Sequence, residues 1–409
     1  MKKLNLVIAV TASAALLAAC GGGSGGGSTS ASVAASARLL GTIAVPNIAP
    51  GGKTFTYDGG QVADGRFYLT DRNNKGVDVV DTTYLVPVGL VQGSGPTAFT
   101  GQAFFPDGRA NNDQTGPNSL QKIPGTNKLY VTDVNSVKVV DTTTLQVTKV
   151  IPINGPNGTP TGYRTDGSCL DKVDNIFMAM NSYDNFITWI DANTDKVIAR
   201  YDYDPATNPA GLEVCAYDPN LQKFFVNNDG YDGAPDGALD VFTLASVKAA
   251  AAAPLVPVVR AASYPVAGCN PNGLDLGPGN DIILACDPSG GANGVPLITL
   301  ILDRTTGAEL ARVKFGGSDL VSYDPVSNRY FLGSRHWQNA GVYNSTLPFN
   351  PVLGIIDAAT RKALPPVPAG NGAHTAVVDS VNGRVFVPYT PTSSNPDFVN
   401  GGIAVYSTK

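Results

Sequence analysis

The sequence repeats one strand-rich unit seven times, at intervals of roughly 50 to 60 residues, which is the spacing of propeller and solenoid repeats. Each unit has a short apolar and aromatic strand, followed by a strand that usually ends in Asp, with turn residues around both. The apolar strand recurs at 66–70, 128–132, 175–179, 223–227, 281–285, 329–333 and 384–388. The strand after it ends at Asp81, Asp141, Asp191, Thr243, Asp303, Asp357 and Ser407. Four short antiparallel strands per unit make one propeller blade, so we predict an all-β fold, a seven-bladed β-propeller.

The two ends of the predicted propeller complete each other. Residues 38–47 read as an isolated fourth strand, whereas the seventh unit stops two residues after Ser407 and lacks its fourth strand. Pairing these segments closes the ring and leaves no open sheet edge. The aspartates that end the strands are expected to bond the backbone of their own turns, as Asp commonly does.

Composition excludes several classes of protein. The chain of 409 residues contains 46 Gly and 30 Pro, which is unsuited to long helices. Apolar residues make up 43% of the chain, enough for a sizeable core. The net charge of −5 gives no basic surface for nucleic acid, so none is expected as a partner.

The N-terminus has the features of a secretory signal. Two lysines precede an apolar run that is too short to span a membrane, and the run ends in Leu17-Ala18-Ala19-Cys20. This ending resembles the lipobox of bacterial lipoproteins, which implies a signal peptide at 1–19 and a lipid on Cys20; an ordinary secretory signal is the alternative. Residues 20–37 then form a Gly/Ser-rich tether, and 38–409 the single propeller domain. Since Gly21 is not the Asp associated with inner-membrane retention, the resemblance favours the outer membrane of the cell envelope.

Two segments, 128–153 (KLYVTDVNSVKVVDTTTLQVTKVIPI) and 65–83 (GRFYLTDRNNKGVDVVDTT), resemble the YVTN family of β-propellers. The resemblance extends, less closely, over nearly the whole mature chain. It implies a seven-bladed fold and little about activity, because propellers serve as binding modules, lactonases, lyases and redox enzymes.

Four cysteines besides Cys20 predict disulfides in an oxidising compartment. Cys269 precedes the first strand of the fifth blade and Cys286 ends its second strand, so antiparallel pairing brings them to one rim. Cys169 and Cys215 lie on the first strands of neighbouring blades, on faces that turn toward each other. We predict both pairs; buried free thiols are the alternative.

One mouth of the ring is predicted to bind ligands. The second-to-third loops and the crossings between blades open on this mouth, and several are long. The innermost strand of each blade starts here, and its first position holds Asn118, Asp166, Glu213, Asn272, Asp319 and His374, with blade one ambiguous among Thr56, Tyr57 and Asp58.

These polar residues are suited to a hard cation such as Ca²⁺, with Glu213, Asn272 and Asp319 as ligands and His374 as a general base. The set loosely resembles the metal site of calcium-dependent propeller lactonases, although those have six blades. The alternative is that the residues form the hydrated lining of any propeller channel.

A binding site without metal would use Asn118 and Asp166 together with His336 and Trp337 of the long sixth-blade loop. For His336 the alternative is an ordinary residue of a surface loop. No CxxCH or P-loop occurs, so neither haem nor a nucleotide cofactor is expected. Two tryptophans are too few for the tryptophan docking of propellers that bind the quinone PQQ.

Two functions stay open at this point. The first is a lipid-anchored envelope module that binds a small ligand, a polymer or an envelope protein through its acidic, loop-rich mouth. The second is a metal-dependent hydrolase or lactonase with its site at the channel.

Overall fold

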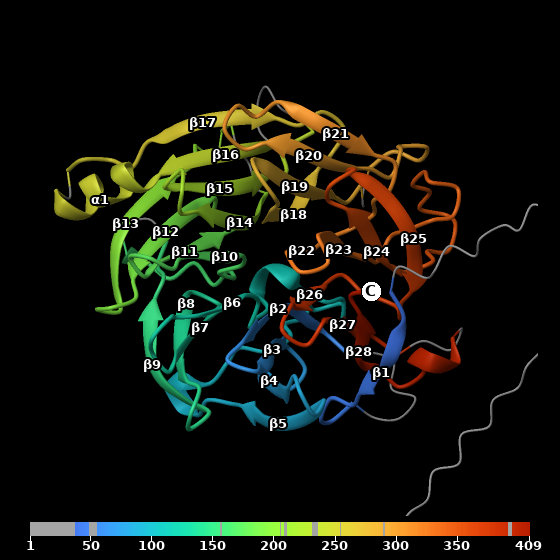
Figure 1. Cartoon of the computed structure of the whole chain (residues 1–409). Coiled ribbons are helices and arrows are strands. Elements are labelled where there is room, and N and C mark those ends of the chain that lie inside the picture. Colours follow the sequence, from blue (N-terminus) through green and yellow to red (C-terminus); the bar gives the residue numbers. More distant parts are fainter. Residues whose placement is uncertain are drawn as a thin grey trace, which may run out of the picture. The chain divides into compact units, whose positions relative to one another are not determined.

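The computed structural model describes residues 37–48, 55–155, 158–204, 206–207, 211–230, 236–253, 255–288, 291–391 and 395–409. In this part of the chain, seven sheets of four antiparallel strands are arranged in a ring (Figure 1). The predicted seven-bladed β-propeller is therefore confirmed. Cys20, the predicted signal and nearly all of the predicted tether lie outside the described residues.

The strands fall into four positions, from the channel outward, in blades one to seven. The innermost strands are β2 (Tyr57–Ala63), β6 (Leu120–Lys122), β10 (Ser168–Asp171), β14 (Leu212–Asp218), β18 (Pro271–Leu276), β22 (Val321–Asp324) and β26 (Val377–Asp379). The second strands are β3 (Arg66–Asp71), β7 (Lys128–Asp133), β11 (Ile176–Asn181), β15 (Lys223–Asn228), β19 (Asp281–Cys286), β23 (Arg329–Ser334) and β27 (Arg384–Tyr389). The third strands are β4 (Gly76–Asp81), β8 (Ser136–Asp141), β12 (Phe186–Asp191), β16 (Ala238–Thr243), β20 (Thr299–Asp303), β24 (Val352–Asp357) and β28 (Gly402–Ser407). The outermost are β5 (Val86–Val91), β9 (Gln146–Pro152), β13 (Lys196–Asp202), β17 (Arg260–Pro265), β21 (Glu309–Val313), β25 (Lys362–Pro368) and β1 (Leu39–Ile43).

The ring closes through β1, which supplies the outermost strand of blade seven. It pairs antiparallel with β28, with Ile43 opposite Ile403, and the two strands lie side by side in Figure 1. Ala37, expected at the end of the tether, is already buried among residues of blades six and seven. The predicted closure is confirmed, and it removes the open edge that blade seven would otherwise present.

Neighbouring blades pack face to face, which explains why the second and third strands read as continuous apolar runs. In β11 every residue is buried. Successive side chains point to opposite faces of the sheet, so Met178 joins the core shared with blade four and Phe177 the core shared with blade two. Each blade thus contributes to two cores.

The aspartates at the strand ends hold the turns. Oδ1 of Asp81 accepts hydrogen bonds of 2.8 Å from the backbone N–H groups of Thr83 and Tyr84. Asp141 holds the corresponding turn of blade two in the same way. Their predicted role in hairpin turns is confirmed.

Both predicted disulfides are confirmed as pairs. Cys269 bonds Cys286 within blade five, and Cys169 bonds Cys215 between blades three and four. The second bond links two sheets that share no backbone hydrogen-bond ladder.

The 3-10 turns of the described chain include η1 (Gly95–Thr97), η2 (Asn112–Gln114) and η4 (Pro396–Phe398), and its one α-helix, α1 (Leu244–Ala252), was not predicted. The Oγ1 of Thr243 accepts a hydrogen bond from the N–H of Ser246 and caps the helix. Thr243 stands where five of the other blades have Asp, and the alanine run after it favours a helix over a tight turn. A search of the described helices for one that could cross a bilayer finds none.

Candidate functional site

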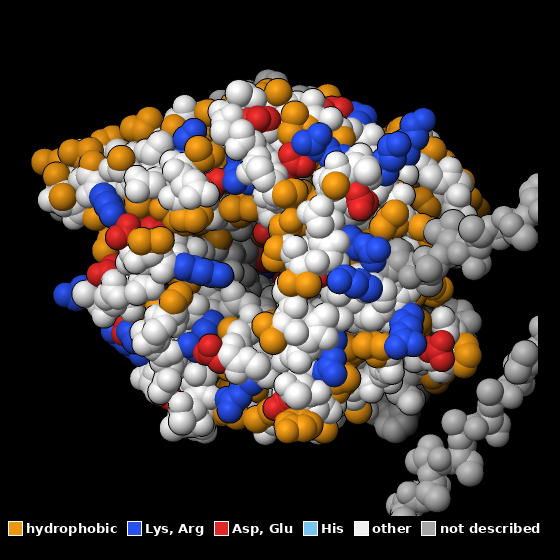
Figure 2. Space-filling view, viewed as in Figure 1, with side chains coloured by type: hydrophobic (Ala, Val, Ile, Leu, Met, Phe, Trp, Pro, Cys, Tyr) orange, Lys and Arg blue, Asp and Glu red, His pale blue; other side chains and the backbone are white. Residues whose placement is uncertain are grey.

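A cavity of about 640 Å³ occupies the channel at the loop-rich mouth, and in the space-filling view the surface is hollowed near the centre of the ring (Figure 2). Its lining contains all the residues predicted from the mouth positions: Asn118, Asp166, Glu213, Asn272, Asp319 and His374. In blade one the residue at the equivalent mouth position is Asp58. Asp58 lines the cavity, and the N–H of the next residue, Gly59, bonds the carbonyl of Asn118, the mouth residue of blade two, at 2.7 Å. The structure therefore brings seven polar residues, one from each blade, into one cavity.

Three arginines share this cavity, and the sequence reasoning missed them. Arg72 and Arg335 directly follow the second strands of blades one and six, and Arg164 lies two residues before Asp166. The residue that follows the second strand also lines the cavity in blades four and five, as Asp229 and Asp287. This recurring position is the sequence signal that could have revealed a second set of lining residues.

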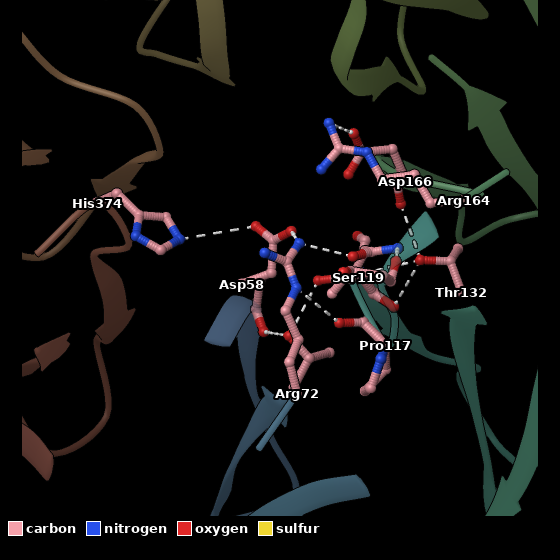
Figure 3. Close-up of polar contacts among 12 residues, drawn as sticks. Asp58, Arg72, Pro117, Ser119, Thr132, Arg164, Asp166 and His374 are labelled. Atoms are coloured by element: carbon pink, nitrogen blue, oxygen red, sulfur yellow. Dashed lines mark hydrogen bonds and ion pairs between the residues drawn. The ribbon is translucent and has the colours of Figure 1, made fainter. Parts of the chain in front are cut away.

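Arg72 lies between blades one and two and is almost fully buried. Its guanidinium forms an ion pair with Asp58 and donates a 2.6 Å hydrogen bond to Oδ1 of Asn118 (Figure 3). Nδ2 of Asn118 in turn donates to the carbonyls of Thr115 and Thr165. Burial raises the pKa of Asp58, but the charge of Arg72 and the proximity of His374 outweigh burial and bring it to about 2.

Arg164 and Asp166 form the second pair, between blades two and three. Nη2 of Arg164 lies 2.7 Å from Oδ2 of Asp166, which also accepts a 3.0 Å hydrogen bond from Oγ of Ser182. Burial raises the pKa of Asp166 even though Arg164 opposes it. Nε of Arg164 is buried and has no hydrogen-bond partner among the described residues.

Arg335 bridges two carboxylates of blades five and six. Its Nη1 lies 3.0 Å from Oδ2 of Asp319, and its Nη2 lies 3.1 Å from Oδ2 of Asp287, whose side chain is 0% exposed. Burial lowers the pKa of Arg335, but these two carboxylates raise it by more. The pKa therefore lies above its ordinary value, and the guanidinium stays charged.

His336 and Trp337, predicted for the ligand-binding mouth, do not line the cavity. Nδ1 of His336 lies 2.8 Å from Oδ1 of Asp287, so His336 supports a lining residue from behind. The Trp337 ring stacks on Phe315 with their centroids 4.5 Å apart, and it packs against the core of blades five and six.

Glu213 and Asp229 form an acidic corner of the cavity. Among the described residues, Glu213 makes no side-chain hydrogen bond or ion pair. Burial raises its pKa well above the ordinary value, and the charges of Asp166 and Asp229 raise it further. Burial also raises the pKa of Asp229 to about 6. This corner therefore favours protons or a cationic group.

The predicted calcium ligands do not form a ready site. Asp319 is held in the ion pair with Arg335, and no three His, Cys, Asp or Glu residues in the described ranges lie close enough together to hold a metal ion. Calcium also prefers six to eight oxygen ligands, whereas this cavity interleaves its carboxylates with guanidinium groups. Calcium binding by Glu213, Asn272 and Asp319 stays a prediction.

His374 is fixed from both sides. Its Nδ1 lies 2.8 Å from the carbonyl oxygen of Gly372, and its ring stacks on Tyr57 with their centroids 4.7 Å apart. A carbonyl only accepts hydrogen bonds, so Nδ1 carries the hydrogen and Nε2 of the neutral ring is the basic nitrogen. Nε2 lies 3.7 Å from Oδ1 of Asp58, as the dashed line in Figure 3 shows.

No protein-family profile matches this chain, and no curated protein matches it either. The resemblance to the YVTN family therefore stays a prediction, whereas the seven-bladed propeller is shown by the arrangement of the strands.

Proposed function

We propose that this protein is a binding module of the bacterial cell envelope, anchored by a lipid on Cys20, and that its channel cavity binds a small zwitterionic ligand such as an amino acid or a short peptide. The observation that carries the proposal is the set of three arginines that converge on the cavity, each held by a carboxylate. A guanidinium held in this way recognises a carboxylate with little loss of conformational entropy. The cavity volume of about 640 Å³ is in the range of small-molecule sites.

The two halves of a zwitterion have separate partners. Arg164 has an unused buried donor, Nε, and is suited to a ligand carboxylate. Glu213 and Asp229 are suited to an ammonium group, because burial raises the pKa of both carboxyl groups and the charges of Asp166 and Asp229 raise that of Glu213 further. An ammonium group would lower the pKa of Glu213, so binding should release a proton.

Isothermal titration calorimetry tests this proposal with amino acids and dipeptides, an amine-free carboxylic acid and a polyamine. We expect the zwitterions to bind more tightly than either singly charged probe, and we expect the heat to depend on the ionisation enthalpy of the buffer because a proton is released. Arg164→Gln and Glu213→Gln should each weaken binding about tenfold or more. Arg109→Gln is the matched control, because Arg109 forms an exposed ion pair with Asp107 and does not line the cavity. Equal affinity for all probes, or binding that neither cavity variant changes, would contradict the proposal.

The anchor is tested separately. In fractionated bacterial cells we expect the unaltered chain in the membrane fraction and Cys20→Ser in the soluble fraction, with a lipid mass on the N-terminal peptide of the unaltered chain only. Identical fractionation of both would remove the lipid anchor from the proposal and leave the binding site unaffected.

A hydrolase or lactonase is the second candidate, and the position of His374 favours it. Nε2, the basic nitrogen of this ring, faces Asp58 in the cavity lining and could activate a water molecule. This second candidate would be supported if the protein hydrolyses members of a lactone panel and His374→Ala abolishes that activity. Melting with Ca²⁺ and with EDTA tests the metal, because a bound ion raises the melting temperature.

A further inference from the structure

A second pocket lies outside the channel, with a volume of about 350 Å³. Six of its lining residues come from the loop between β5 and β6, one from the crossing between blades two and three, and one from the turn between β11 and β12. They are Phe104, Phe105, Pro106, Asn111, Asp113, Gln114, Tyr163 and Tyr183. None of them lines the channel cavity.

The pocket presents aromatic rings to solvent. Phe104 is 63% exposed and Tyr183 is 47% exposed. The rings of Tyr163 and Tyr183 stack with their centroids 3.8 Å apart and their planes inclined by 25°. Because the two rings, from different blade connections, face each other, the pair offers a ligand its outer faces and its edges.

The backbone around the pocket is held in place before any ligand binds. Phe104 pairs with Ala110 in a β-bridge, and the N–H of Phe105 bonds the carbonyl of Arg109 at 2.8 Å. The carbonyl of Asp113 accepts a 2.7 Å hydrogen bond from the N–H of Arg164, which ties the loop to the residue after Tyr163. A pocket that is already ordered loses little entropy when it binds.

Polar side chains stand beside the rings. Gln114 is exposed and Asp113 half-buried, and Nδ2 of the buried Asn111 donates a 3.0 Å hydrogen bond to Oε1 of Gln114. Oδ1 of Asn111 has no hydrogen-bond partner among the described residues. Amides and carboxylates next to an aromatic surface supply the donors and acceptors that hydroxyl groups need.

We propose that this pocket binds a sugar unit of a polysaccharide. The face of a sugar ring carries polarised C–H bonds, which are attracted to the negative face of an aromatic ring, and its edge carries hydroxyls that can bond Asp113 and Gln114. Nucleic acid would also stack on tyrosines, but this chain has a net charge of −5. A lipid surface would require an apolar patch with basic residues, whereas three of the eight lining residues here carry a carboxylate or an amide.

The pocket and the channel cavity share a wall. Asn112 and Arg164 line the channel, while their neighbours Asn111, Asp113 and Tyr163 line the outer pocket. A polysaccharide held on the rings therefore lies beside the channel mouth. The proposal does not depend on what the channel binds.

Two assays of the full chain test the sugar-binding proposal. The first is affinity electrophoresis in native gels that contain dextran, a galactomannan, a soluble β-glucan or hydroxyethyl cellulose. The second is sedimentation with peptidoglycan sacculi. We expect at least one of these polymers to retain the protein, and Tyr183→Ala and Phe104→Ala each to weaken that binding about tenfold. Tyr84→Ala is the matched control, because Tyr84 is 77% exposed in the turn between β4 and β5, away from the pocket. Glu213→Gln should leave retention unchanged although it impairs the channel, because Glu213 lines the channel cavity and not this pocket, so the two sites fail independently.

Two results would overturn the proposal. One is that no polymer of the panel retains the protein, or that retention is the same in both pocket variants as in the unaltered chain. The other is that a proline-rich peptide binds in fluorescence anisotropy, loses its binding in Tyr183→Ala and is not displaced by any of the polymers, since such peptides also dock on aromatic surfaces.

Discussion

Nζ of Lys138 lies 3.3 Å from Oδ2 of Asp133 in the interior of blade two, and both side chains are almost fully buried. Blade one has Asp78 where blade two has Lys138, because Asp78 pairs with Leu69 of its second strand as Lys138 pairs with Val131. Asp71 takes the place of Asp133, so in blade one two buried carboxyl groups face each other. Neither carboxylate oxygen of Asp78 accepts a hydrogen bond from a donor group in the described part of the chain.

This pair should make the stability of the protein depend on pH. Burial raises the pKa of Asp78 well above its ordinary value, and the charge of Asp71 raises it further. The folded state then binds the proton more tightly than the unfolded state, so the stabilisation is complete below about pH 4 and is lost as the pH rises through the folded pKa. We expect Asp78→Asn to raise the free energy of unfolding by about 1–3 kcal/mol at pH 8 and to change it little at pH 4, as measured by chemical denaturation.

The turn residue Asp141 is the control for this experiment. Backbone hydrogen bonds hold its pKa below the ordinary value, so its contribution is present at neutral pH and is lost as the pH falls. Asp141→Asn should therefore destabilise the protein at pH 8 and not at low pH. A gain of stability at pH 8 in both variants would mean that the effect comes from net charge and not from the Asp71 and Asp78 pair.

Arg335→Gln should destabilise the fold. The variant removes the guanidinium that is paired with the buried carboxylate of Asp287, and removing one partner of a buried ion pair is costly. We expect a loss of about 2–4 kcal/mol in the free energy of unfolding. Arg109→Gln, whose pair with Asp107 is exposed, should change it by no more than about 0.5 kcal/mol. Equal effects of the two substitutions would show that the cavity arginine is not held as tightly as its contacts indicate.

The two disulfides should contribute unequally. Cys169 and Cys215 are separated by 46 positions, and Cys269 and Cys286 by 17. Chain entropy predicts about 4 kcal/mol for the longer loop and about 3 kcal/mol for the shorter, because closing a longer loop restricts the unfolded chain more. Denaturation of the double variants Cys169→Ala with Cys215→Ala, and Cys269→Ala with Cys286→Ala, measures both. A larger loss for the shorter loop would rule out loop length as the deciding term.

The closing strand β1 should be essential for the whole ring. Ile43 is buried in the core shared by blades one and seven, so Ile43→Asp should cost more than about 3 kcal/mol and expose the edge of β28. Leu40, on the same strand, is exposed, and Leu40→Asp should leave stability nearly unchanged. Circular dichroism gives the stability and size-exclusion chromatography detects association through the open edge. If Ile43→Asp melts like the unaltered chain, the ring does not depend on β1.

Asp229 should titrate near neutral pH. Burial raises its pKa to about 6, so its contribution to stability falls as the pH rises from about 4 to 6. Burial also raises the pKa of Asp275 to about 6, so in carboxyl-selective NMR we expect Asp signals from both residues near this midpoint, of which only the Asp229 signal is absent from Asp229→Asn. That variant should be more stable at pH 8 by about 1–2 kcal/mol and unchanged near pH 4. A midpoint near 4 would contradict the buried acidic corner on which the binding of an ammonium group rests.

The repeated pattern of the sequence determined the blade number, the apolar strands, the closing strand, the turn aspartates and both disulfide pairs. These features depend on local periodicity and on strand pairing, which recur at equivalent positions in each unit. The same alignment identified Glu213, Asp319 and His374 as residues of the channel mouth. It did not identify helix α1, because capping by Thr243 is a feature of one blade only.

The tertiary structure alone decided what surrounds those residues. Arg164 pairs with Asp166 of the same blade connection, but Arg335 reaches both Asp287 and Asp319, and Tyr163 stacks on Tyr183 from another turn. Such contacts depend on the direction of long side chains where blades meet, and no periodicity in the sequence encodes that direction. For the same reason the sequence did not reveal that Asp319 pairs with Arg335 or that His336 lies against Asp287.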